Sequence, residues 1–208
     1  MRREGRVALR VESALELIAS RMKIRILSLL ALFVSATLFA AEHDRITKSK
    51  TFSGHEWTID VPADFAHESS AAPAPQFETW GFYPEARKDG SRPMVQVSTM
   101  LVPEGQAAQA FANLFAEQMI RGVEKRREDW NVERSDINIA GIPMRRYAWT
   151  GVTVPAPDGA AVRRPARGIM LVGATRGIAF ALHAQDVDAY AVETVPALEE
   201  FLQSFRVK

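Results

Sequence analysis

One long helical pattern, flanked on both sides by strand-like segments, constrains the fold of this chain most strongly. Across residues 105–127, apolar side chains recur at spacings of three and four, with polar side chains between them. This pattern is typical of an amphipathic helix that buries one stripe. A second helix is expected near the C-terminus, where Thr194 provides a cap, Pro196 falls in the first turn and Leu198 begins a buried stripe.

Strand-like segments pair into hairpins before and after the long helix. The expected pairs are residues 51–52 with 57–61, 77–83 with 94–102, 130–139 with 142–152, and 167–172 with 178–185. Residues 178–182 are apolar at nearly every position, which fits a central strand covered on both faces. The Ala- and Pro-rich stretch 62–76 and the stretch 154–164 are expected to be loops.

The order of the elements is therefore two hairpins, a helix, two hairpins and a helix. A mostly antiparallel sheet with helices packed on its faces buries all of these apolar stripes. The sequence thus predicts an α+β fold, an α/β/α sandwich. Since domains usually have about 100 to 200 residues, we expect one globular domain over residues 51–208 of the 208-residue chain.

The N-terminal segment has the pattern of a secretory signal. Residues 26–40 carry no charge, basic residues precede them, and Glu42 follows closely. We expect a signal peptide over residues 22–41 that begins near Met22, a linker over residues 42–50, and a periplasmic or secreted protein with no stable membrane span after cleavage. Residues 1–21 are an upstream extension that comes from a misassigned start codon, or alternatively the cytoplasmic tail of an uncleaved anchor.

The charge balance changes when this segment is removed. The whole chain has 26 basic and 25 acidic residues, for a net charge of +1. Residues 1–41 hold seven of the basic and three of the acidic residues, so residues 42–208 have a net charge of −3. This balance argues against binding of nucleic acid. The chain has no cysteine, which excludes disulfides, thiolate metal sites and cysteine nucleophiles.

Four short stretches resemble the PsbP-like fold family, including small exported bacterial members of the DcrB type. They are residues 57–65 (WTIDVPADF), 139–143 (IAGIP), 168–180 and 201–206 (FLQSFR), and the resemblance covers most of residues 52–208. The resemblance implies an α/β/α sandwich with a binding or assembly role. The family has no shared catalytic residues to carry over to this chain.

No recognisable catalytic, metal or cofactor motif is present, so we expect no enzymatic activity and no cofactor. The chain lacks the zinc-protease, P-loop, dinucleotide-binding and G-x-S-x-G patterns. His183 lies near Gln185, Asp186 and Asp188, which forms a weak candidate metal site. The favoured interpretation is that the two aspartates make turn or capping hydrogen bonds and that His183 lies on a sheet face.

Candidate binding residues are aromatic side chains and arginines. Trp80 lies on one strand, while Arg145, Tyr147 and Trp149 share one face of another. If no helix covers such a face, it forms an aromatic surface for a partner or a glycan; the favoured alternative is that these rings fill the core.

Two basic groups also stand out in the sequence. Arg163, Arg164 and Arg167 have few acidic neighbours in sequence and could contact an anionic partner, although an exposed loop is the simpler interpretation. Residues 125–127 adjoin acidic residues, which favours a solvated helix end.

The function predicted from the sequence is that of an exported, non-enzymatic binding or assembly protein of the cell envelope. It would bind an envelope protein or an extracytoplasmic ligand. The alternative is a small-ligand or glycan binder that uses an aromatic strand face. An enzyme would need a pocket in which His183 meets a carboxylate and a hydroxyl.

Overall fold

The computed structural model describes residues 48–70, 77–154 and 162–208. In chain order, its elements are β1 (Ser49–Ser53), β2 (Trp57–Pro62), β3 (Ala66–Ser70), β4 (Phe77–Tyr83), β5 (Met94–Leu101), α2 (Ala108–Glu124), β6 (Arg127–Ile139), β7 (Ile142–Thr153), β8 (Pro165–Thr175), β9 (Ile178–Val187), α3 (Asp188–Leu202) and β10 (Arg206–Val207). Neither helix in this part of the chain is long and apolar enough to span a bilayer.

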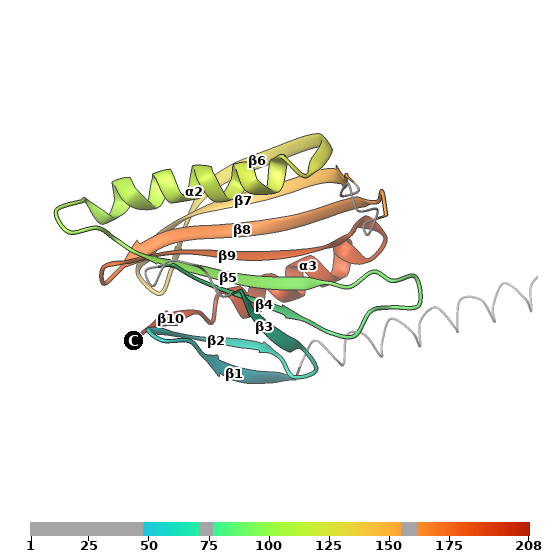
Figure 1. Cartoon of the computed structure of the whole chain (residues 1–208), viewed down its shortest axis with the longest axis horizontal. Helices are drawn as coiled ribbons and strands as arrows, with labels where there is room; N and C mark the ends of the chain where they lie inside the picture. Colours follow the sequence, from blue (N-terminus) through green and yellow to red (C-terminus); the bar gives the residue numbers. More distant parts are fainter. Residues whose placement is uncertain (1–47, 71–76, 155–161) are drawn as a thin grey trace, which may run out of the picture. The chain divides into compact units, whose positions relative to one another are not determined.

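A seven-stranded antiparallel sheet forms the centre of the fold (Figure 1). Its strand order is β3-β4-β5-β9-β8-β7-β6. The helix α2 carries the chain from β5 to the far edge at β6, and three hairpins then return it to β9, beside β5. The main sheet is therefore completed by a pairing between strands that are far apart in the sequence.

The two helices cover opposite faces of this sheet. Successive side chains of a strand point to opposite faces, so neighbouring residues of one strand contact different helices. On β8, Ile169 and Leu171 pack with residues of α3, whereas Met170 and Val172 pack with residues of α2. The predicted α+β sandwich is confirmed, and β9 is covered on both faces as expected.

A small sheet of order β1-β2-β10 lies on the α3 side. Trp57, Ile59 and Val61 alternate along β2 and are all buried in the same core as α3. Phe205 lies just before β10, and its ring packs 5.9 Å from Trp57 and 4.7 Å from Phe180. The C-terminal residues thereby tie the small sheet to the main one.

The predicted order of hairpins and helices is confirmed, but two elements differ from expectation. The stretch expected to be a loop contains β3, a mostly exposed edge strand whose backbone pairs with β4. Helix α3 begins at Asp188, six residues before the predicted cap Thr194, so Pro196 lies inside the helix. Residues along α3, such as Val195 and Leu198, are buried. This burial offsets the free-energy cost of the hydrogen bond that the proline cannot make.

Several sequence predictions fall outside the described residues. These are the upstream extension 1–21, the signal peptide 22–41, most of the linker 42–50, and the loop segments 71–76 and 155–161.

Candidate functional site

A cavity of about 240 Å³ lies between the C-terminal half of α2 and the sheet strands β5, β8 and β9. Three glutamine side chains line it, namely Gln96, Gln118 and Gln185. Its apolar lining includes Met94, Met119 and Met170. Gln96 on β5 is the cross-strand partner of His183 on β9, which places both side chains on the face that α2 partly covers. We call this cavity the α2 pocket.

His183 is the buried titratable group of the α2 pocket, with 4% of its surface exposed. Burial first, and then the charges of Arg127 and Arg126, lower its pKa to about 3. Its Nε2 accepts a hydrogen bond of 3.2 Å from the indole N–H of Trp149. Because an indole N–H can only donate, the neutral imidazole keeps its proton on Nδ1.

Arg127 lies beside this histidine at the start of β6. One Nη donates to the side-chain oxygen of Gln185 at 3.0 Å and the other to the carbonyl of Arg126 at 2.9 Å. The guanidinium is 5.2 Å from the centre of the Trp149 ring, and burial lowers its pKa. Its Nε is buried, and no group in the described residues accepts a hydrogen bond from it.

His183 is expected to stay neutral from pH 8 down to about pH 4, as judged by the NMR shift of its imidazole Cε1–H. The unfolded chain binds this proton near pH 6.5 and the folded chain only near pH 3. The free energy of unfolding should therefore fall as the pH is lowered through that window. His183→Gln should remove this part of the pH dependence. Titration of the folded-state imidazole near pH 6.5 would contradict the prediction.

Tyr147 and Trp149 do not form an exposed aromatic face, because α2 and its neighbours cover them. Both are at most 2% exposed and belong to the core under α2. Trp130 on β6 stacks on Trp149, with 5.4 Å between the ring centres. Arg145 lies nearer the surface, where it pairs with Asp136. The burial of Tyr147 and Trp149 therefore agrees with the interpretation that their rings fill the core.

Trp80 lies on the opposite face of the sheet from Tyr147 and Trp149, so it does not join them. It is half-buried, and its ring is 4.8 Å from Phe52 and 5.7 Å from the exposed His67. Its indole N–H donates to Glu78 at 2.6 Å. We call Phe52, His67 and Trp80 the aromatic cluster.

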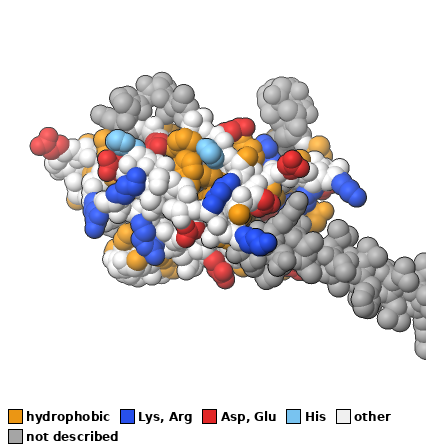
Figure 2. Space-filling model, turned by 90° about the horizontal axis from the view of Figure 1, so that it is seen from below, with side chains coloured by type: hydrophobic (Ala, Val, Ile, Leu, Met, Phe, Trp, Pro, Cys, Tyr) orange, Lys and Arg blue, Asp and Glu red, His pale blue; other side chains and the backbone are white. Residues whose placement is uncertain are grey.

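The three arginines with few acidic neighbours in sequence each have an acidic partner in the structure. Arg163 pairs with Glu128, Arg164 with Asp89, and Arg167 with Asp188. These partners come from other parts of the fold, so the sequence around the arginines did not reveal them. Figure 2 shows that both basic and acidic side chains are present on one face of the molecule.

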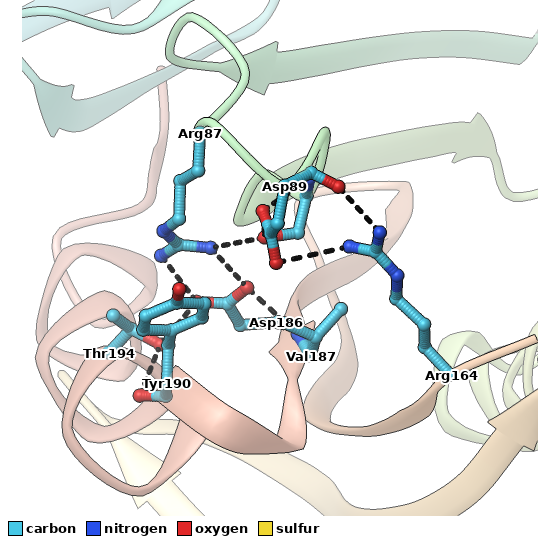
Figure 3. A network of polar contacts seen from close by, with 8 residues as sticks. Arg87, Asp89, Arg164, Asp186, Val187, Tyr190 and Thr194 are labelled. Atoms are coloured by element: carbon cyan, nitrogen blue, oxygen red, sulfur yellow. Dashed lines mark hydrogen bonds and ion pairs between the residues drawn. The ribbon is translucent and has the colours of Figure 1, made fainter. Parts of the chain in front are cut away.

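Asp186 and His183 do not converge, because they point to opposite faces of β9. Asp186 is instead the centre of a buried ion-pair network with Arg87 (Figure 3). Both Nη atoms of Arg87 donate to its carboxylate, at 2.9 and 2.8 Å, and the guanidinium lies 4.0 Å from the centre of the Tyr190 ring. Among the described residues, no group of three His, Asp or Glu side chains is placed to hold a metal ion.

Arg127, Gln96 and Gln118 were not among the predicted site residues, and Gln185 was named only beside His183 in the weak candidate metal site. Arg127 belongs to the basic run that was expected to be a solvated helix end, but it lies half-buried over Trp149. One sequence signal was available: Gln96 and Ser98 on β5, and His183 and Gln185 on β9, are polar residues at alternate positions. Such alternation marks one sheet face as polar.

No known family model matches the chain, and no curated protein matches it. Solved structures do resemble it. The solution structure of cyanobacterial PsbP (CyanoP) from Synechocystis sp. PCC 6803 has a TM-score of 0.55 and 8% identity, over 77% of this chain and 92% of that chain. The Ran-binding protein Mog1p of Saccharomyces cerevisiae has a TM-score of 0.47 and 12% identity, over 77% and 95%.

A third similar structure is LpqN of Mycobacterium tuberculosis, described as involved in cell envelope biogenesis. Its TM-score is 0.46 and its identity 14%, over 77% of this chain and 91% of that chain. At these identities the similarity concerns the fold and not the activity. The resemblance to exported members of the DcrB type stays a prediction. The chain has the Mog1p/PsbP-like fold, with two helices packed on a seven-stranded antiparallel sheet and a small second sheet.

Proposed function

We propose that this protein is an exported, non-enzymatic binding protein of the cell envelope that holds a small ligand in the α2 pocket. The observation that carries the proposal is the composition of that pocket. Its lining combines amides, guanidiniums and a neutral imidazole with apolar side chains, and the described residues contribute no hydroxyl, carboxylate or amine side chain to it. A site of this kind has directional hydrogen-bonding groups for a ligand, as small-molecule pockets do.

The same lining argues against acid–base or nucleophilic catalysis in this pocket. His183 is the residue type most often used as a general base, but its acceptor nitrogen already receives the Trp149 N–H. Within the described part of the chain, no side chain of the lining is a nucleophile that this imidazole could activate. Binding is therefore the activity that these residues support best.

Gly122 provides a direct test, because it lines the α2 pocket and a Cβ added there would meet no atom within 4 Å. Gly122→Leu should keep the fold and fill the pocket. The measurement is the change in tryptophan fluorescence of the purified protein on addition of a low-mass envelope extract, since Trp149 contacts the site.

The matched control is Gly122→Ala, which gives the same gain in helix propensity, up to about 1 kcal/mol, with little loss of volume. We expect binding by the wild type and by Gly122→Ala, and at least about a tenfold loss of affinity in Gly122→Leu. Equal binding by both variants would refute the pocket as the site.

Export is a separate part of the proposal and rests on the signal pattern at residues 22–41. It is tested by cell fractionation and by N-terminal sequencing of the exported protein. A new N-terminus close to Glu42 would support it. Retention of all the protein in the cytoplasm would contradict it, and an intact Met1 on exported protein would favour the uncleaved anchor.

The aromatic cluster favours a second candidate function, the binding of a glycan or partner at the surface. Phe52 and Trp80 are only half-buried, and His67 beside them is exposed. Trp80→Ala should then weaken binding to immobilised envelope glycans at least about tenfold, whereas Gly122→Leu should leave that binding unchanged. The opposite pattern would assign binding to the α2 pocket.

A further inference from the structure

Arg127 differs from the other partly buried arginines in having no acidic partner among the described residues. The described arginines that do pair with a carboxylate are Arg87, Arg145, Arg146, Arg163, Arg164 and Arg167. Arg127 instead uses two neutral oxygens, those of Gln185 and of its neighbouring peptide. Its Nε–H is buried, and none of the residues that the structure describes accepts a hydrogen bond from it.

This arrangement leaves a positive charge and a hydrogen-bond donor incompletely compensated. A buried donor without a partner typically costs about 1 to 3 kcal/mol. The ring of Trp149 offsets part of the cost through a cation–π contact, but it supplies no acceptor for the Nε–H. An anion in the adjacent α2 pocket would supply both an opposite charge and acceptor oxygens.

The pocket itself has the charge that such a ligand requires. Arg126 and Arg127 both line it, and none of the described residues that line it is an aspartate or glutamate. The neutral His183 adds an N–H donor, since its Nδ1 carries the proton, and Gln96 and Gln118 add amide groups. All the formal charge that faces the ligand from these residues is positive.

The remainder of the lining is apolar. Met94, Met119 and Met170 line the pocket with Val123, and methionine side chains adapt to irregular apolar groups. A volume of about 240 Å³ is smaller than the pockets that hold drug-sized ligands, which start at about 300 Å³. The ligand must therefore be compact and have an apolar part.

We propose that the α2 pocket binds a small carboxylate with a short apolar tail, and that Arg127 pairs with its carboxylate group. This inference rests on the proposed function of the pocket and specifies the chemical class of its ligand. Inorganic phosphate shares the charge but lacks the tail, so it serves as a separate arm of the test.

The test uses calorimetric titration of the purified protein with four probes: butyrate, the neutral butyramide, the cationic butylamine, and inorganic phosphate. Butyrate should bind at least about tenfold more tightly than each of the others, because a charge-assisted hydrogen bond is worth roughly 1.5 to 3 kcal/mol. Arg127→Gln should weaken butyrate binding at least about tenfold. The control Arg121→Gln removes an exposed charge from the same helix end, outside the pocket lining, and should change the affinity less than about twofold.

The outcomes separate this inference from the proposed function. If Gly122→Leu blocks a probe that Arg127→Gln still binds with wild-type affinity, the pocket is a ligand site but the pairing with Arg127 is refuted. Tighter binding of phosphate than of butyrate would refute the inference that the ligand has an apolar tail. Loss of butyrate binding in a folded Arg127→Gln protein, together with retention in Arg121→Gln, is the result that supports the proposal. Thermal unfolding of each variant confirms that the fold is intact.

Discussion

Asp186→Asn should lower the free energy of unfolding by about 3 to 5 kcal/mol, which is the usual cost of removing one partner from a buried ion pair. The side chain of Asp186 is completely buried, and that of Arg87 is 13% exposed. The substitution would remove the carboxylate that both Nη atoms of Arg87 contact. The largely buried guanidinium would then face a neutral amide in place of this carboxylate.

The carboxylate of Asp186 also organises the start of α3, which increases the expected effect. One oxygen accepts the backbone N–H of Val187 at 2.8 Å, directly before the helix. The other accepts the hydroxyl of Thr194 at 2.7 Å, within the helix. Asparagine can replace only one of these acceptor oxygens. The network therefore links the segment that holds Arg87 to both β9 and α3 (Figure 3).

Chemical denaturation followed by tryptophan fluorescence measures this loss. The control is Asp188→Asn, because Asp188 pairs with Arg167 near the surface, where both side chains are more than a third exposed. An exposed pair contributes at most about 1 kcal/mol. In a double-mutant cycle, replacing both Arg87 and Asp186 by leucine should cost less than the sum of the two single substitutions. Equal losses in Asp186→Asn and Asp188→Asn would show that the buried pair has no special role.

The fold could be predicted because local patterns carry most of its information. The spacing of apolar residues identified α2, alternation identified β7, and a nearly continuous apolar run identified β9. These patterns fix which face of each element is buried, and a layered α+β arrangement then follows. By contrast, β3 has few apolar side chains, so its strand conformation comes from backbone pairing with β4, which leaves no clear signal in its sequence.

The candidate site could not be predicted, because it depends on contacts between distant parts of the chain. Gln96 meets His183 only because α2 crosses the sheet and leaves β5 beside β9. Arg127 reaches the same pocket from the first residue of β6. Their closeness in sequence made His183 and Asp186 a candidate for one shared site, but the alternation along β9 places their side chains on opposite faces. Long-range strand order therefore decides which polar residues share a site.

Gly168→Ala should be the most damaging single-methyl addition on the α2 side of the sheet, with a loss of about 3 kcal/mol or more in the free energy of unfolding. A Cβ on Gly168 would lie 2.4 Å from the carbonyl oxygen of Ala184 on the neighbouring strand β9. It would also lie 2.7 Å from the ring of Trp149. The nearer obstacle is backbone, so β8 and β9 would have to move apart to admit the methyl group.

The comparison with Gly122→Ala isolates this crowding, because the added methyl at position 122 meets no atom within 4 Å and should stabilise α2. Both variants add one methyl group, so a loss in Gly168→Ala alone, measured by chemical denaturation, assigns the effect to the clash. Displacement of Trp149 should also break its hydrogen bond to His183 and shift the tryptophan emission. A stability within about 0.5 kcal/mol of wild type would contradict the prediction. The absence of a Cβ at Gly168 would then not be what makes room for the Trp149 ring.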